Sequence, residues 1–310
     1  MTRLIWSILL LGGVVGQAEG QTLFAPDAQL EKVWGEGTFT EGPAYGPNGR
    51  IYFSDIGNRI MIFDPATGQT TVYREPSGRA NGLIFDQQGR LVACEGAMPG
   101  GQRRVSITDK NGAVRALADR WMGKRLNSPN DLTIDTQGRI YFSDPRYAGD
   151  EPREIDTESV YRIDPDGMVT QIITDVQKPN GVILSPDMKT LYVADNHPKG
   201  NRHLLAFELK PDGSVGAKRL LYDFGKERGI DGMAMDEQGN IYATAGSGKA
   251  SGVYVFNPQG ERLAFIATPE TATNCVFGGQ ERNLLYITAG KSLYRIPLKT
   301  KGFALYWPKE

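Results

Sequence analysis

The chain has 310 residues, 38 of them glycine and 18 proline. This composition favours many turns over long helices, and the length suits one large domain or two ordinary ones. The formal net charge is −1, with Lys and Arg scattered along the chain, so nothing here predicts binding to nucleic acid.

The first 21 residues have the pattern of a signal peptide. Arg3 provides a positive start, residues 4–15 are apolar, and Ala18 is a small residue where a signal peptidase could cut. The apolar run is short for a membrane span, although a retained N-terminal anchor remains the alternative. We expect export to the periplasm or medium, no membrane contact after cleavage, and one folded domain over residues 22–310.

Cysteine and histidine are scarce. Cys94 and Cys275 are too few for a disulfide framework in an exported chain of this length, and we expect both to be free and buried. His197 and His203 belong to no metal-ligand or catalytic-triad motif.

A unit of about 40–50 residues repeats six times. Each copy begins with a polar, oxygen-bearing residue, and a second β-rich run follows ten or eleven residues later, usually after an Asn-Gly or Gln-Gly turn. The opening residues are Glu41, Asn81, Asn130, Asn180, Asp231 and Asn274. Two further alternating strands, joined by turns rich in Asp, Pro and Gly, complete most copies.

Six units of four strands predict an all-β fold, a six-bladed β-propeller with antiparallel blades. The sixth unit lacks an obvious fourth strand. We expect Leu30–Trp34, which precedes the first unit, to complete that blade and close the ring, although the segment 302–307 could compete for the place. The tyrosines of the second strands are expected to pack between blades, and Asp55, Asp144 and Asp195 are interpreted as turn residues.

The innermost strands of a propeller line its axis, so the six opening residues should form a ring. Carboxylates and amides suit a hard cation such as Ca²⁺, which takes about 6–8 oxygen ligands, whereas Zn²⁺ prefers nitrogen and sulfur. Two alternatives stay open. The polar residues could make only local hydrogen bonds to the backbone, or the ion could be purely structural. Insertions at 96–103, 145–157 and 196–203 are expected to roof this site with polar side chains.

Several stretches together resemble the SMP-30/gluconolactonase family of six-bladed propellers over essentially the whole mature chain. They are Glu41-Gly42-Pro43, Leu126 to Leu132, Tyr141 to Pro145, Pro179-Asn180-Gly181 and Ile230-Asp231-Gly232. The resemblance implies a Ca²⁺-dependent lactonase, with organophosphate hydrolases among its members.

The resemblance also implies residue roles. Glu41, Asn180 and Asp231 match metal ligands, Asn130 matches a fourth polar residue at the metal or substrate, and Asp231 matches the catalytic base. Asn81 and Ser128 are further expected substrate contacts. Ser128 stands where some sugar lactonases carry an arginine, and Arg146, Tyr147 and Glu151 are alternative contacts.

We therefore expect a hydrolase that opens a sugar lactone with one divalent cation, Ca²⁺ as first choice and Mg²⁺, Mn²⁺ or Zn²⁺ as substitutes. The expected partner is the small-molecule lactone, and no protein partner can be named. An organophosphate hydrolase using the same metal site, and a non-enzymatic binding propeller with a structural ion, are the alternatives.

Overall fold

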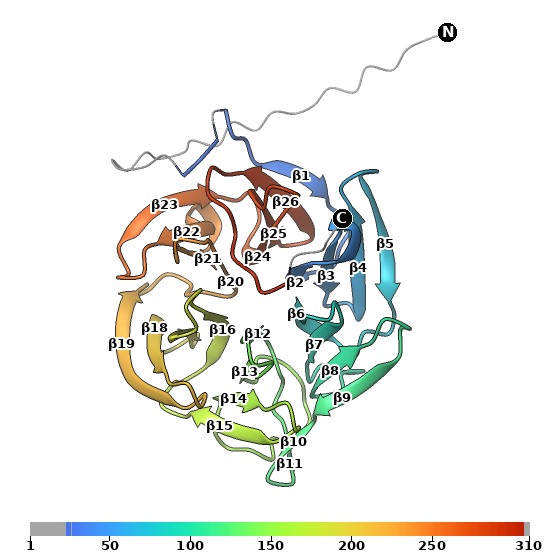
Figure 1. Ribbon diagram of the computed structural model, residues 1–310, viewed down its shortest axis with the longest axis vertical. Helices are drawn as coiled ribbons and strands as arrows, with labels where there is room; N and C mark the ends of the chain where they lie inside the picture. The colour runs from blue at the N-terminus through green and yellow to red at the C-terminus, as the bar shows by residue number, and fades with distance from the viewer. Residues whose placement is uncertain (1–22, 26, 307–310) are drawn as a thin grey trace.

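The computed structural model describes residues 23–25 and 27–306. Six four-stranded antiparallel sheets are arranged around a common axis (Figure 1), and their inner strands line a central channel along it. This confirms the predicted six-bladed propeller. The expected signal peptide, residues 1–21, lies outside the described residues.

The first five blades each take four consecutive strands, ordered from the axis outward. Blades one to three contain β2 (Thr40–Tyr45), β3 (Ile51–Asp55), β4 (Arg59–Asp64) and β5 (Gln69–Arg74); β6 (Ala80–Phe85), β7 (Leu91–Glu95), β8 (Arg104–Thr108) and β9 (Val114–Ala118); and β12 (Leu132–Ile134), β13 (Ile140–Asp144), β14 (Ser159–Ile163) and β15 (Val169–Ile173). Blades four and five contain β16 (Pro179–Leu184), β17 (Thr190–Asn196), β18 (Arg202–Leu209) and β19 (Val215–Asp223); and β20 (Met233–Met235), β21 (Ile241–Ala245), β22 (Gly252–Phe256) and β23 (Arg262–Ala267).

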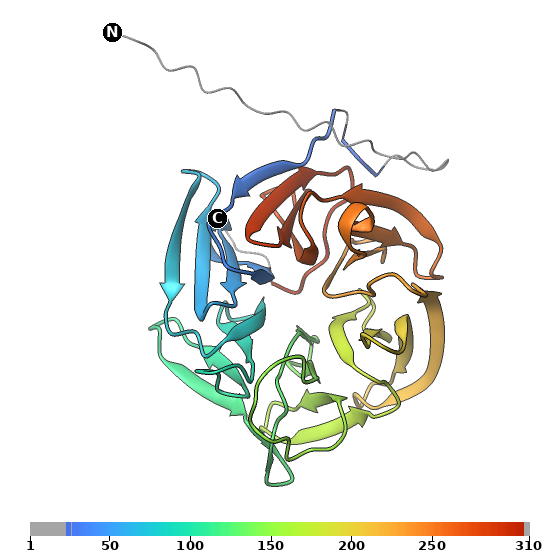
Figure 2. The same cartoon turned by 180° about the vertical axis from the view of Figure 1, so that it is seen from behind.

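The sixth blade combines both ends of the chain. It contains β24 (Ala272–Gly278), β25 (Leu284–Ala289), β26 (Ser292–Pro297) and, on the outside, β1 (Glu31–Trp34). β1 pairs antiparallel with β26, as the blue strand beside the red blade shows in Figure 2. The predicted closure by the N-terminal strand is therefore confirmed, and the C-terminal segment does not take that place.

Glu270 strengthens this closure. Its carboxylate accepts hydrogen bonds from Lys32 Nζ at 3.0 Å, Ser292 Oγ at 2.5 Å and Tyr294 Oη at 2.7 Å. Burial alone would raise the pKa of Glu270, but these donors and the Lys291 backbone N–H outweigh it and lower the pKa to about 2. The carboxylate thus links β1 to β26 in its charged form.

A small hairpin of β10 (Arg120–Trp121) and β11 (Lys124–Arg125) between blades two and three was not predicted. The described residues contain two short 3-10 turns, Pro47–Gly49 and Gly248–Ala250, but no α-helix. Accordingly, no helix in the described part of the chain is long and apolar enough to cross a bilayer.

Six hydrophobic clusters fill the spaces between neighbouring blades. The second-strand tyrosines take part as predicted: Tyr141, for example, packs with Val182 and Val193 of the following blade. The same holds for the other four, which are Tyr52, Tyr192, Tyr242 and Tyr286. Because the core is distributed in this way, each blade depends on both neighbours for its burial.

The inner strands also contact one another directly around the axis. Backbone N–H groups of one blade donate to the next, as in Gly82 N to Asn130 O and Gly181 N to Asp231 O, both at 2.7 Å. A Cβ atom added at Gly181 would come within 2.5 Å of the Asp231 carbonyl oxygen. Glycine after the polar opening residue therefore lets adjacent inner strands approach closely enough to hold the ring together.

Candidate functional site

The polar opening residues lie where the inner strands are irregular. In three blades the pairing of the first and second strands shifts register at this point, between Glu41 and Ala44, between Ala80 and Leu83, and between Pro179 and Val182. A bulge of this kind can redirect a side chain out of the regular alternation of a strand. The local break explains why polar residues here face the axis.

A cavity of about 450 Å³ opens at the end of the channel where the polar opening residues lie. Five of the six predicted ring residues line it, together with residues that were not predicted, among them Arg228. The five are Glu41, Asn81, Asn130, Asn180 and Asp231. Side chains that are far apart in the sequence therefore meet in one polar chamber.

The two carboxylates of this chamber influence each other. Glu41 is only 4% exposed, and burial first, followed by the charge of Asp231, raises its pKa well above the ordinary value. Burial also raises the pKa of Asp231, although Arg228 and Asn180 oppose that effect. The two carboxylates repel each other, and a cation bound between them would offset this repulsion.

Arg228 and Asn180 hold Asp231 in place. The Arg228 guanidinium forms an ion pair with Asp231 and also donates to the Ala272 carbonyl oxygen at 2.9 Å. Asn180 Nδ2 donates to Asp231 Oδ1 at 2.7 Å. Arg228 lies three residues before Asp231 in the chain, and this adjacency of opposite charges is the signal that could have identified it.

The donor set contains oxygen atoms almost exclusively. No group of three or more His, Cys, Asp or Glu side chains gathers at one point among the described residues. The acidic part of the site is therefore the Glu41–Asp231 pair, with neutral amides from asparagines beside it. Oxygen donors of mixed charge fit Ca²⁺ or a similar hard cation better than Zn²⁺.

The prediction that Asn274 is the sixth ring member is wrong by one residue. Val276 pairs with Tyr286 just as Ala44 pairs with Tyr52, and three residues before Val276 stands Thr273. The Thr273 hydroxyl is fully buried and donates to the Thr40 carbonyl oxygen at 2.8 Å. Blade six thus supplies a structural hydrogen bond at the position where the other blades supply a cavity side chain.

Asn274 instead lies one step deeper in the channel, against Asp131. These two residues occupy the position that is glycine in the other four blades. Asn274 hydrogen-bonds the Asp131 carboxylate, which also accepts from the Leu132 and Val182 backbone N–H groups. Burial outweighs these bonds and raises the pKa of Asp131 to about 7. We call this pair the Asp131–Asn274 bridge; it connects opposite blades three and six.

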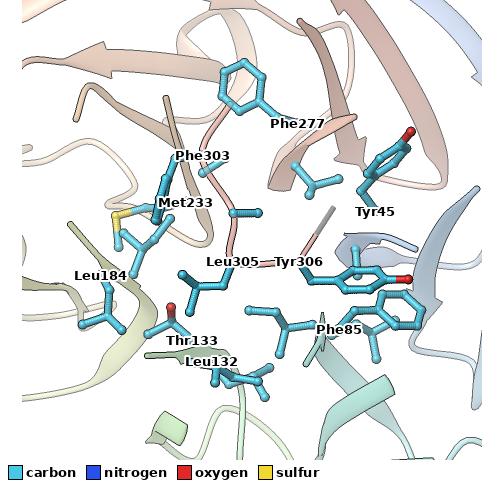
Figure 3. Close-up of a pocket in the computed structure, with 18 of the residues that line it drawn as sticks. Tyr45, Phe85, Leu132, Thr133, Leu184, Met233, Phe277, Phe303, Leu305 and Tyr306 are labelled. Carbon is cyan, nitrogen blue, oxygen red and sulfur yellow. The ribbon is translucent and has the colours of Figure 1, made fainter. Parts of the chain in front are cut away.

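Beyond this bridge lies a second, smaller pocket of about 130 Å³ with mostly apolar walls. The C-terminal segment covers it: Phe303 N donates to Met235 O at 2.8 Å, and the Tyr306 ring lies 5.7 Å from that of Phe85. Figure 3 shows Phe303, Leu305 and Tyr306 among the inner-strand side chains. This end of the channel is therefore filled with apolar groups, and the polar chamber opens at the other end.

Of the three expected substrate contacts, two line the chamber and one does not. Asn81 and Asn130 line the chamber, whereas Ser128 is not among its lining residues. Ser128 Oγ accepts a hydrogen bond from Ala97 N at 3.0 Å, and its own N–H donates to Asp144. Ser128 thus connects two loops behind the chamber wall.

The roof of the chamber comes from two of the three predicted insertions. Tyr147 lines the mouth from one, and Asn196, Pro198 and Arg202 line it from the next. The insertion at 96–103 contributes none of the lining residues. Phe39, 40% exposed, and Ile56, both of blade one, complete the chamber lining.

Arg146 and Glu151, the other expected contacts in the Tyr147 loop, are not among the residues that line the chamber, and the Glu151 side chain is 55% exposed. Arg146 donates to the Asn127 and Glu151 carbonyl oxygens, and Glu151 pairs with Arg103 at 2.8 Å. Tyr147 Oη donates to the Asn196 carbonyl oxygen at 3.0 Å, and its ring receives Lys178 Nζ at 4.9 Å. The roof therefore contains fewer charges than the sequence indicated.

The interpretation of Asp55, Asp144 and Asp195 as turn residues is corrected by the structure. All three are buried, and each accepts hydrogen bonds from two backbone N–H groups of the segment that leads into the inner strand of its own blade. Because these segments end at the polar opening residues, the three aspartates position the chamber walls. Cys94 and Cys275 are free and buried, as predicted.

Comparison with known proteins agrees with this geometry. The model of the SMP-30/gluconolactonase/LRE-like region matches residues 39–291. A gluconolactonase of Zymomonas mobilis is 31% identical over 302 residues, covering 88% of this chain and 82% of that protein. The solved structure of a gluconolactonase from Xanthomonas campestris is 33% identical with a TM-score of 0.80, covering 89% of this chain and 91% of that one.

More distant structures share the same architecture. Regucalcin from Agrobacterium tumefaciens, a calcium-binding protein, is 20% identical with a TM-score of 0.72 and covers 88% of this chain and 94% of its own. The resemblance inferred from the sequence motifs is confirmed by the family match. The chain belongs to the SMP-30/gluconolactonase/LRE-like family.

Proposed function

We propose that this protein is a hydrolase that opens a sugar lactone in the polar chamber. The observation that carries the proposal is the buried Glu41–Asp231 carboxylate pair beside Asn81, Asn130 and Asn180. Lactone hydrolysis is also the activity in the names of the Zymomonas and Xanthomonas relatives. The sugar substrate, the cation and the residue roles are our proposal for this chain.

A divalent cation, Ca²⁺ as first choice, fits the chamber because two mutually repelling carboxylates and neutral amide oxygens surround it. Glu41, Asn180 and Asp231 would hold it, with Asn130 as a fourth donor. When bound, the cation would polarise the lactone carbonyl and stabilise the negative charge that develops on its oxygen.

Asp231 is the proposed base. It would take a proton from the attacking water and return it to the ring oxygen that leaves. The ion pair with Arg228 and the hydrogen bond from Asn180 keep its carboxylate oriented. The Asn81 and Asn130 amides supply donors and acceptors for sugar hydroxyls.

The test is hydrolysis of glucono-δ-lactone by the purified protein, followed by acid release and corrected for the spontaneous reaction. Activity should disappear with a chelator and return with added Ca²⁺. Activity that persists in chelator contradicts the metal role, and no activity on any sugar lactone contradicts the proposed function.

Metal binding has a second readout that does not depend on turnover. A ligand that binds only the folded state stabilises it, by about 2.7 kcal/mol at 100 times its dissociation constant. Ca²⁺ should therefore raise the melting temperature of the wild type, and the rise should be lost in Glu41→Gln. An equal rise in both proteins would place the ion elsewhere.

An organophosphate triester is the second candidate substrate. Phe39, Ile56, Tyr147 and Pro198 give the chamber mouth apolar surfaces, which suit aryl and alkyl groups. Paraoxon hydrolysis with a higher kcat/KM than any sugar lactone would favour this alternative.

We also propose that the mature protein is exported. The support is the sequence pattern of residues 1–21 alone. Fractionation followed by N-terminal sequencing tests it: recovery from the cytoplasm alone would contradict export, and an intact Met1 in the periplasm or medium would contradict cleavage.

A further inference from the structure

Arg202 contributes a positive charge to the chamber mouth that no carboxylate matches. Its guanidinium donates to three backbone carbonyl oxygens, those of Pro198, Lys226 and Glu227. Among the described residues, no Asp or Glu side chain forms a salt bridge with it. A guanidinium held only by neutral acceptors keeps its full charge available to a ligand.

The other cations near the chamber are already engaged. Arg228 is paired with Asp231. Lys178 pairs with Glu158 at 2.6 Å and also contacts the Tyr147 ring. Of these three cations, Arg202 alone combines a place in the chamber lining with an unmatched charge.

Arg202 also has donors to spare and a fixed position. A guanidinium carries five N–H hydrogens, and three are used by the carbonyl oxygens of two different loops. Since Pro198 lies before β18 and Lys226 follows β19, these bonds brace the guanidinium from both sides. A braced, planar group with free N–H hydrogens is suited to bind a carboxylate, sulfonate or phosphate.

The position of Arg202 indicates which part of a substrate it would contact. The proposed reacting centre is deep in the chamber, at Glu41 and Asp231, whereas Arg202 belongs to the roof formed by the 196–203 insertion. A lactone with its carbonyl at the carboxylate pair would direct its opposite end toward the roof. An anionic group there would form charge-assisted hydrogen bonds with Arg202, while a hydroxyl would bind the guanidinium much more weakly.

We propose that Arg202 is a specificity-determining residue that binds an anionic substituent, so that the preferred substrate is a sugar lactone bearing a second acidic group. This inference rests on the proposed lactone hydrolysis. It assigns the charge of the substrate and a residue that the family motifs did not indicate.

The test compares one neutral lactone, glucono-δ-lactone, with two anionic ones, 6-phosphogluconolactone and glucaro-1,4-lactone. The wild type should have its highest kcat/KM on an anionic lactone. Arg202→Gln should lower that value about 10- to 100-fold, mainly through KM, and change the neutral substrate by less than about threefold. Which anionic lactone loses more distinguishes phosphate from carboxylate recognition.

Two further variants serve as controls. Arg219→Gln removes an exposed arginine from β19 of the same blade and should leave all three kcat/KM values unchanged. Arg202→Lys retains the charge and should keep part of the preference for anions. Raising the ionic strength should lower kcat/KM for the anionic lactones more than for the neutral one.

Three results would overturn the inference. The first is a wild type that hydrolyses the neutral lactone better than both anionic ones. The second is an Arg202→Gln variant that loses activity equally on all three, which indicates a structural role. The third is a wild type that hydrolyses no lactone, which removes the proposed function as well and so differs from the first two.

Discussion

The two ends of the central channel are lined by the same inner strands, yet they have opposite chemistry. On one side of the Asp131–Asn274 bridge, a chamber of about 450 Å³ is lined by two carboxylates, four amides and two guanidinium groups. On the other side, a pocket of about 130 Å³ is lined mainly by apolar side chains and covered by Phe303, Leu305 and Tyr306.

The difference follows from strand regularity. Polar residues stand at the start of each inner strand, where pairing with the second strand is interrupted or has not begun. Further along, the pairing is regular and apolar residues pack in the channel. Binding groups can therefore change at the irregular end with little effect on the packed end, and the two ends should respond differently to substitution.

The largest effect should come from the polar chamber. Asp231→Asn removes the proposed base and should lower kcat by about 10²- to 10⁴-fold while the circular dichroism spectrum stays unchanged. Steady-state kinetics on glucono-δ-lactone measures this, with Asp212→Asn in an exposed turn as the control. A fully active Asp231→Asn variant would exclude Asp231 from the chemistry.

Next comes the apolar pocket, where stability and not turnover should suffer. Phe277 is 2% exposed and its ring packs edge-on against Tyr242 at 4.9 Å. Phe277→Ala should cost about 3–5 kcal/mol of unfolding free energy, measured by urea denaturation, with kcat of the folded enzyme unchanged. Val72→Ala on the exposed strand β5 is the control. A large loss of kcat with unchanged stability would contradict the division between the two ends.

The bridge itself should affect both ends at once. Asn274→Ala removes a donor from the buried Asp131 carboxylate and should cost about 1–3 kcal/mol in stability. Because Asp131 follows Asn130 directly, kcat/KM should fall as well. Urea denaturation and lactone kinetics on one preparation test this, with the exposed Asn111→Ala as control. A loss of stability alone would assign the bridge to the apolar end, and a loss of kcat/KM alone would assign it to the polar chamber.

The smallest effect should come from Glu270, which lies in neither compartment. Its pKa is about 2 in the folded protein against an ordinary value of 4.5, so its stabilising contribution is complete above about pH 4.5 and is lost as the pH falls toward 2. Glu270→Gln should lower the free energy of unfolding slightly at pH 7, by about 1 kcal/mol or less, and the difference from wild type should vanish near pH 2. A difference independent of pH would contradict this origin.

Most of the fold could be predicted because each blade repeats the same local pattern. Turn residues and alternating strands determine blade number, and the missing fourth strand of unit six pointed to closure by Leu30–Trp34. The error at Asn274 arose in the turn between β24 and β25. In blade six, Phe277 pairs with Leu285, which lies eight residues later, whereas in blade one Tyr45 pairs with Ile51, which lies six residues later. The longer turn shifts the inner strand relative to the second strand, so the predicted ring residue was one position too late.

The site could be predicted only in part. Residues at equivalent positions of a repeat, such as Glu41 and Asn180, are recognisable because the repeat brings them together. Arg228, Arg202 and Phe39 come from segments outside the repeat pattern, and their direction depends on loop conformation. Nor could the sequence distinguish Tyr147, which faces the chamber, from Arg146, whose guanidinium is bound by carbonyl oxygens behind the wall.

The seam of the ring has a consequence for how the molecule assembles. Glu31 and Arg295, which form an ion pair, lie 264 positions apart in the sequence, so the N-terminal strand β1 must wait for blade six before the ring can close. Until then, blade six presents an open edge at β26. Such a long-range contact is slow to find, and the interval before it forms is when the nascent chain is most exposed to pairing with the wrong strand.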